Sequence, residues 1–315
     1  MSTAVDALKI KLAESASFHS FRSESAVCDA LKSLRWNAKH GAYYEDLETK
    51  KQREIDVIAQ QFWSRKTKNG DQRVRITVLI EVKTMKGFHL LVSPFEEDGF
   101  SFYQNVHWLG DPLGNYSELS SALKVNGMEE AAIDKFVQRL QQFAYPRQKA
   151  RPWLLMVRPN TETVFTSFRE TNIGAEKELD NSVFWRASQS LRSASKSIQK
   201  SILEGHLEDI ATSVKYAPKT EEKRINYVLD WAKDGINRID LIHPIIVTDA
   251  DIWVSGSGGP EPVKWSRFGQ YSFDGIPEWW CDVVNSKHFA EYAQLISMHY
   301  ASELKSAKAT LQKQN

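Results

Sequence analysis

The sequence has little of what marks secreted, zinc-binding or membrane proteins. Its 315 residues include only two cysteines, Cys28 and Cys281, which form neither a zinc-type spacing nor a disulfide framework. The histidines show no zinc-type spacing either. No stretch approaches the roughly 20 apolar residues of a membrane span, and the first residues lack the apolar run of a secretory signal. We therefore expect a cytoplasmic protein with no membrane contact.

Two further absences narrow the class of function. The formal net charge is only +1, so any basic surface for nucleic acid has to be local. The chain has no Gly-x-x-x-x-Gly-Lys-Ser/Thr loop, which excludes an ATP-driven motor of that type, and the glycines at 255–262 do not form a nucleophile elbow. Apolar residues make up 42% and charged residues 26%, as in ordinary globular proteins with a substantial core.

Predicted strands and helices alternate along the chain, which favours one α/β domain over residues 1–315 with a mixed central sheet flanked by helices. Strands at 53–60 and 74–83 would form a hairpin around the Asn-Gly turn at 69–70. A helix at 23–36 would begin at Ser23 or Ser25. Further helices are expected at 5–16, 128–145, 183–204, 221–234 and 286–308, further strands at 88–93, 153–158, 243–254 and near 283, and a loop at 255–262.

The hairpin carries charges among its aliphatic residues. In "REIDVIAQ" (53–60) and "VLIEVKTMK" (78–86), strand alternation places Glu81 and Lys83 on one face, while the opposite faces would be buried. Antiparallel pairing would set Asp56 across from Glu81. Two adjacent carboxylates repel each other unless a cation lies between them, and Mg²⁺ prefers such oxygen ligands. Lys83 could then orient or deprotonate water, or stabilise charge on a phosphate.

The order of these residues resembles the PD-(D/E)XK nuclease superfamily, whose fold is restriction-endonuclease-like. The matching residues are Glu24 in the helix, Asp56 in the first strand, and Glu81 and Lys83 in the second, all within residues 20–93. The proline of the family name is absent, because Ile55 precedes Asp56.

The resemblance implies a role for each matching residue. Asp56 and Glu81 would bind Mg²⁺ (or Mn²⁺), the carbonyl of Val82 would add a ligand, and Lys83 would serve the nucleophile. Glu24 would support the catalytic and metal site. The resemblance also implies a restriction-endonuclease-like core, with residues 150–315 as a C-terminal extension to which the sequence assigns no role.

The function implied by the resemblance is Mg²⁺-dependent hydrolysis of phosphodiester bonds in DNA, for defence against foreign DNA or for repair. DNA would be the partner, together with a second copy of the chain or another protein. Three alternatives stay open: a surface ladder of salt bridges with no chemistry, a nucleic-acid-binding protein of the same fold that does not cleave, and a nuclease that a partner activates.

Two basic stretches are candidate contacts for a phosphate backbone. One stretch is the hairpin loop, and the other is a stripe of basic residues at helical spacing that contains no acidic residue. A solvated loop tip and a solvated helix face would explain the same residues without any binding. The candidates are Arg65, Lys66, Lys68 and Arg73 in the loop, and Arg192, Lys196 and Lys200 in the helix.

Overall fold

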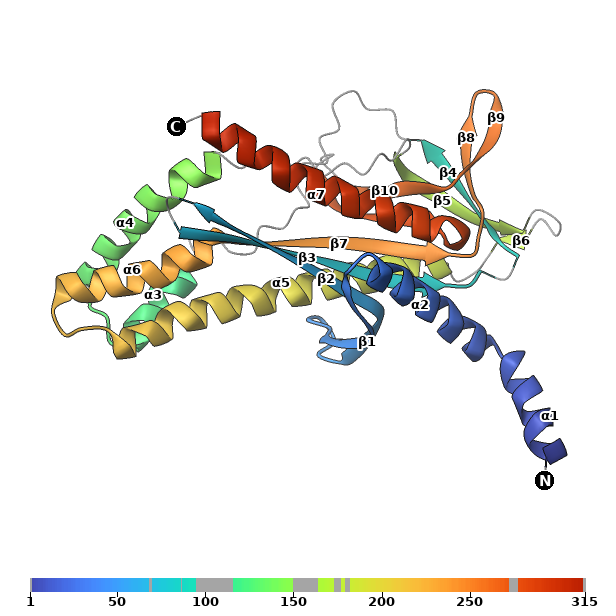
Figure 1. Ribbon diagram of the computed structural model, residues 1–315, viewed down its shortest axis with the longest axis horizontal. Coiled ribbons are helices and arrows are strands. Elements are labelled where there is room, and N and C mark those ends of the chain that lie inside the picture. Colours follow the sequence, from blue (N-terminus) through green and yellow to red (C-terminus); the bar gives the residue numbers. More distant parts are fainter. Residues whose placement is uncertain are drawn as a thin grey trace.

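A large mixed sheet with helices on both faces is the framework of the protein (Figure 1). A computed structural model describes residues 2–67, 70–85, 87–94, 116–149, 164–172, 177–178, 182–271 and 277–313. The sheet has 11 strands in the order β1-β2-β3-β7-β11-β10-β5-β4-β8-β9, and β6 pairs with β5. The strands are β1 (Asn37–Glu45), β2 (Gln52–Thr67), β3 (Gly70–Lys83), β4 (His89–Pro94), β5 (Val164–Asn172), β6 (Lys177–Glu178), β7 (Arg238–Thr248), β8 (Ile252–Gly256), β9 (Gly259–Val263), β10 (Trp265–Tyr271) and β11 (Pro277–Asn285). The predicted mixed sheet is confirmed.

Helices cover the sheet in two layers. The helices are α1 (Ser2–Ala13), α2 (Ala16–Ser33), α3 (Tyr116–Val125), α4 (Glu130–Lys149), α5 (Val183–Tyr216), α6 (Glu221–Asn237) and α7 (Phe289–Lys313), with a 3₁₀ turn at Ser286–His288. One apolar core joins α2 and α7 to the sheet, and a second joins the first half of α5 to the sheet. A third core packs α3, α4 and α6 around the end of α5, at one end of the molecule in Figure 1.

The motif-bearing hairpin lies beside a strand from the second half of the chain. β2 pairs antiparallel with β3 from Val57↔Ile80 to Thr67↔Gly70. On its other edge, β3 pairs in parallel with the whole length of β7. Alternation along β3 holds as predicted, because Ile80 and Val82 belong to the core under α2 and α7. Both edges of β3 are therefore paired up to Ile80, and β7 continues beside its last residues as far as Lys83.

Several element boundaries differ from the predicted ones. α2 begins at Ala16 and is capped by Ser15, whose side chain accepts a hydrogen bond from the Phe18 amide, so it starts earlier than predicted. α4 continues through Pro146, because a proline in a helix removes one hydrogen-bond donor without always ending it. The predicted strand at 243–254 is interrupted between β7 and β8, and the predicted loop at 255–262 is largely the β8–β9 hairpin. The strand predicted at 153–158 lies outside the described residues.

A buried ionic network ties the sheet to α7. The guanidinium of Arg267 donates two hydrogen bonds to the carboxylate of Asp282, at 2.6 and 2.9 Å. His243 and Tyr292 also contact this carboxylate, and all four residues are almost completely buried. Burial alone would raise the pKa of Asp282, but Arg267 and His243 hold it below the usual range. This network has no access to solvent, which indicates a structural role.

No helix within the described ranges is both long enough and apolar enough to span a lipid bilayer.

Candidate active site

The predicted pairing of Asp56 with Glu81 follows from the register of the hairpin. The β2–β3 ladder ends at Val57↔Ile80, so Asp56 and Glu81 are the next residues on the two strands. At this point one pair of the β1–β2 ladder is missing. The β1–β2 pairing passes from His40↔Val57 to Ala42↔Ile55, and Gly41 in between has a φ of 60°, which favours glycine.

This irregularity corrects one detail of the predicted hairpin. Ile55 and Val57 are both buried, as expected, but they do not share a face: Ile55 packs in the core under α5 and Val57 in the core under α2 and α7. Asp56 lies at the change of face, and its Oδ2 accepts a hydrogen bond of 2.7 Å from the Val82 amide. The carboxylate of Asp56 is thereby fixed to the end of β3.

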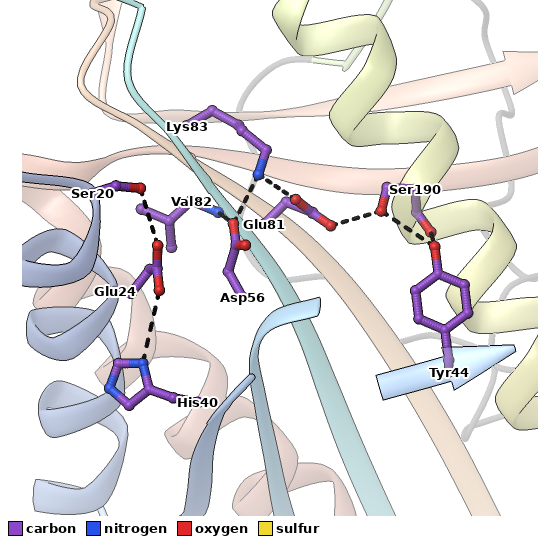
Figure 2. A network of polar contacts seen from close by, with 9 residues as sticks. All are labelled: Ser20, Glu24, His40, Tyr44, Asp56, Glu81, Val82, Lys83 and Ser190. Carbon is purple, nitrogen blue, oxygen red and sulfur yellow. Dashed lines mark hydrogen bonds and ion pairs between the residues drawn. The ribbon is translucent and has the colours of Figure 1, made fainter. Parts of the chain in front are cut away.

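Lys83 joins the two predicted carboxylates (Figure 2). Its Nζ lies 2.8 Å from Asp56 Oδ2 and also forms a close ion pair with Glu81 Oε2. One small cation therefore contacts an oxygen of each carboxylate, so the two carboxylates face a common point. The exposed fraction differs within the group: the Glu81 side chain is 4% exposed, Asp56 21% and Lys83 28%. The cluster is open to solvent on the side of Asp56 and Lys83.

Burial and mutual charge set the protonation of the group. Burial raises the pKa of Glu81, and the neighbouring Asp56 raises it further, while the ion pair with Lys83 opposes both. Burial alone would lower the pKa of Lys83, but the negative charges of Glu81 and Asp56 outweigh it, so its pKa is raised. Lys83 is therefore an ammonium in this arrangement, suited to donate hydrogen bonds and to offset negative charge.

Sequence reasoning missed two residues on the α5 side of the group. Ser190, on α5, donates a hydrogen bond of 2.7 Å to Glu81 Oε1. The hydroxyl of Tyr44, on β1, lies 3.2 Å from the Ser190 carbonyl oxygen and 3.3 Å from its Oγ (Figure 2). These contacts hold the Glu81 carboxylate through Oε1, while Lys83 contacts its other oxygen, Oε2. No local pattern in the sequence signals them, because Ser190 is 109 residues from Glu81.

Glu24 lies next to this group but on the other side of β3. A glutamate in the first turn of a helix can simply offset the helix dipole. Glu24 is in the middle of α2, so this explanation does not apply to it. Its two oxygens face Ser20 Oγ at 3.0 Å and His40 Nδ1 at 4.0 Å. α2 packs on the face of the sheet that holds the Val82 side chain, whereas Ser190 holds Glu81 from the α5 side. The structure thus brings Asp56, Glu81 and Lys83 together and leaves Glu24 adjacent.

The donor set of Asp56 and Glu81 fits a small hard cation. Carboxylate oxygens are the ligands that Mg²⁺ and Mn²⁺ prefer, and Mg²⁺ is commonly bound by one or two carboxylates while it keeps several waters. Across the described ranges, no three or more His, Cys, Asp or Glu side chains are grouped closely enough to form a larger metal site. A pair of carboxylates with the Val82 carbonyl as a further candidate ligand is what the chain offers.

A basic cleft lies on the α5 side of Glu81. It has a volume of about 550 Å³ and lies between the β1–β2 turn and α5. Ser190 and Tyr44 line it, so its wall is one hydrogen bond from Glu81. The other lining residues are Asp46, Leu47, Glu48, Thr49 and Arg53 from the turn and β2, and Trp185, Arg186, Gln189, Arg192, Ser193 and Lys196 from α5. Basic side chains outnumber acidic ones in this lining.

The predicted phosphate contacts separate into two groups. Arg192 and Lys196 line the cleft, but Lys200 forms an ion pair with Glu204 at 3.5 Å, so the predicted stripe is not free of acids. Arg73 lies within β3 and not in a loop, and it forms an ion pair of 3.5 Å with Asp234. Arg65 and Lys66 belong to β2, with side chains outside the described part of the structure, and Lys68 is outside it altogether. At about 3.3 Å per residue, Arg65 is roughly 30 Å along β2 from Asp56.

Comparison of the chain with protein-family models, with curated proteins and with solved structures found no match. The class of the protein therefore has to be argued from the site itself.

Proposed function

We propose that the protein is a Mg²⁺-dependent nuclease that hydrolyses phosphodiester bonds in DNA. The observation that carries this proposal is the contact of one ammonium, Lys83 Nζ, with both Asp56 and Glu81 at the open end of a rigid hairpin. Two carboxylates and a lysine in this arrangement are the equipment for metal-assisted phosphodiester hydrolysis. The order of the residues resembles the PD-(D/E)XK superfamily, and we propose that α2, β2 and β3 correspond to its restriction-endonuclease-like core.

In this mechanism Asp56 and Glu81 hold the cation, with the Val82 carbonyl as a further ligand. A bound Mg²⁺ supplies polarisation of a phosphoryl oxygen and of a coordinated water. Lys83, whose pKa is raised, keeps its proton and donates hydrogen bonds to the attacking water or to the phosphate. Ser190 keeps the Glu81 carboxylate oriented through its hydrogen bond.

Two features of the surroundings support hydrolysis over a surface ladder of salt bridges. Glu81 is almost completely buried, and a carboxylate that only decorates a surface has no reason to be taken out of water. The cleft next to it carries an excess of basic side chains, which suits a polyanionic substrate. DNA, with defence or repair as the biological setting, is the substrate that the resemblance favours.

The test is cleavage by the purified chain. Wild type, Lys83→Ala and the control Lys264→Ala are incubated with plasmid, linear duplex, single-stranded DNA and RNA, in Mg²⁺, Mn²⁺ or EDTA. Lys264 is a suitable control because it pairs with Glu291 on the surface. We expect cleavage by wild type and Lys264→Ala in Mg²⁺, none in EDTA, and a loss of at least about 100-fold in Lys83→Ala. Equal behaviour of the three proteins on every substrate would show that the proposal is wrong.

The main alternative is a protein of the same fold that binds nucleic acid without cleaving it, or that cleaves only with a partner. The bridging position of Lys83 favours this reading, because its ammonium already contacts both carboxylates where a metal ion would lie. Binding without cleavage in the same assays would select it.

A further inference from the structure

The carboxylate site by itself does not distinguish single-stranded from duplex nucleic acid, but the shape and charge of the adjacent cleft do. One wall is the first half of α5. The side chains of Arg186, Gln189, Ser193 and Lys196 follow each other at spacings of three and four residues, so they form one stripe that faces the cleft. The intervening face of the helix is buried in the core. The stripe is therefore held in place by the packing of the helix.

The other wall is the turn between β1 and β2. Asp46 holds this turn by accepting hydrogen bonds of 3.0 Å from the amides of Glu48 and Thr49. Its second oxygen forms an ion pair of 2.5 Å with Arg53. The backbone also closes the turn, because the Lys50 amide donates to the Asp46 carbonyl at 2.8 Å. Both walls are thus preformed.

The charge left over in the cleft is positive. Arg53 is neutralised by Asp46, and Arg192 donates a hydrogen bond of 3.2 Å to Gln270. Arg186 and Lys196 are exposed, and neither has an acidic partner among the residues that the structure describes. Glu48 is the remaining acidic side chain of the lining. Phosphate groups in this cleft would meet cations that pair with no carboxylate of the described ranges.

The cleft also exposes an aromatic side chain next to these cations. Trp185 is 43% exposed although it lies on the otherwise well-packed start of α5, and its ring makes an edge contact with Phe268 at 6.5 Å between centroids. An exposed aromatic beside unpaired cations is the combination that binds single-stranded nucleic acid, with bases on the ring and phosphates on the cations. A base inside a duplex is stacked on its neighbours and cannot reach such a ring.

Among the described residues, the basic side chains next along α5 and toward the far end of β3 do not continue the cleft into a track for a duplex. Lys200, the next basic residue of the stripe, pairs with Glu204. Arg73 and Arg75, toward the far end of β3, are paired as well, with Asp234 and Asp240. A volume of about 550 Å³ is in the range of sites for a single small ligand such as one nucleotide.

We propose that the cleft between the β1–β2 turn and α5 binds one nucleotide of a single-stranded polynucleotide, with its base stacked on Trp185 and the two phosphates that flank it on Arg186 and Lys196. One consequence rests on the proposed function: the nucleic acid presented to Asp56 and Glu81 is single-stranded or locally unpaired. Lys196 lies six residues beyond Ser190, about 9 Å along the helix, so the bound nucleotide is close to the reacting phosphate.

The test measures binding of the full chain in EDTA, where metal-dependent cleavage cannot occur. Fluorescently labelled oligothymidylate, oligouridylate and a DNA duplex of equal length are titrated by anisotropy. We expect both single strands to bind more tightly than the duplex, and the two arms to show whether the sugar matters. Trp185→Ala should weaken binding of the single strands about 5- to 100-fold, whereas Trp185→Phe, which keeps a ring, should stay within about threefold of wild type.

Arg186→Ala/Lys196→Ala tests the cations independently of the ring. The double variant should weaken binding and reduce the slope of log affinity against log salt by about 1.4, since each phosphate contact to a single strand contributes about 0.7. Lys200→Ala is the matched control on the same helix and should bind as wild type. Tighter binding of the duplex, or wild-type binding by both cleft variants, would overturn the inference. Binding that depends on the cleft but is never followed by cleavage in Mg²⁺ would instead overturn the proposed hydrolysis and leave the cleft assigned.

Discussion

The bridging contact of Lys83 leads to a prediction that separates a metal site from an ordinary ion pair. Lys83→Met keeps most of the aliphatic stem and removes the ammonium that lies between Asp56 and Glu81. Removing one partner of a buried ion pair costs about 3–5 kcal/mol. Because the Lys83 side chain is 28% exposed, solvent screening reduces this cost, and we expect a loss of about 2–3 kcal/mol in the free energy of unfolding.

Magnesium should restore this loss in the variant. A ligand present at 100 times its Kd stabilises the folded state by about 2.7 kcal/mol, which is similar in size to the expected loss. In wild type, Mg²⁺ has to displace the ammonium of Lys83 from the same oxygens, so its stabilising effect should be smaller. The variant should therefore be destabilised in EDTA, by several degrees in Tm at about 2 °C per kcal/mol, and should recover in Mg²⁺ without regaining activity.

The assay is thermal unfolding of wild type, Lys83→Met and Lys264→Met at mildly alkaline pH, in EDTA and in a series of Mg²⁺ concentrations at constant ionic strength. The alkaline pH is needed because the pKa of Glu81 is raised, mainly by burial, and a protonated Glu81 would relieve the repulsion without a metal. Lys264→Met removes a surface ion pair with Glu291 and should show little response to Mg²⁺. If Mg²⁺ raises the Tm of Lys83→Met no more than that of the control, the two carboxylates do not form a metal site.

Two further predictions concern the frame around the site. Arg267→Met should lower the free energy of unfolding by about 3–5 kcal/mol in urea denaturation, because it leaves the fully buried Asp282 without its cation, and Arg267→Met/Asp282→Leu should be less destabilised than the single variant. A single-variant loss below about 1 kcal/mol would contradict this account. The pKa of His206 is lowered from 6.5, chiefly by burial, so the folded chain binds this proton less readily than the unfolded chain. Its contribution to stability is complete above pH 6.5 and is lost as the pH falls below it. His206→Gln should therefore flatten the decline in stability between about pH 6.5 and 5 in urea titrations, and an unchanged slope would refute the assignment.

The sequence predicted the central part of the candidate site because strand alternation is a local signal. Apolar residues at every second position of 74–83 required one face of that strand to be buried, and this placed Glu81 and Lys83 together on the other face. The turn signal predicted the hairpin but not its exact register: Gly70 pairs with Thr67, two residues away from the register of a two-residue turn at Asn69-Gly70, and this observed register sets Asp56 next to Glu81. The order of Glu24, Asp56, Glu81 and Lys83 also carried the resemblance, although it could not show that Glu24 approaches β3 from the other face of the sheet.

The tertiary structure decided what surrounds these residues. β7 lies beside β3, and α5 brings Ser190 to Glu81 from 109 residues away, a contact that leaves no periodic trace in the sequence. It also sorted the basic residues that the structure describes: Arg73 and Lys200 meet acidic partners, whereas Arg186 and Lys196 face a cleft with Trp185. The types and spacing of residues can be read from each segment of the sequence alone. Whether a charged side chain has a partner depends on which distant segment packs against it. For this protein, the sequence determined the carboxylates and the lysine, and only the packing of α5 on the sheet placed a basic cleft beside Glu81.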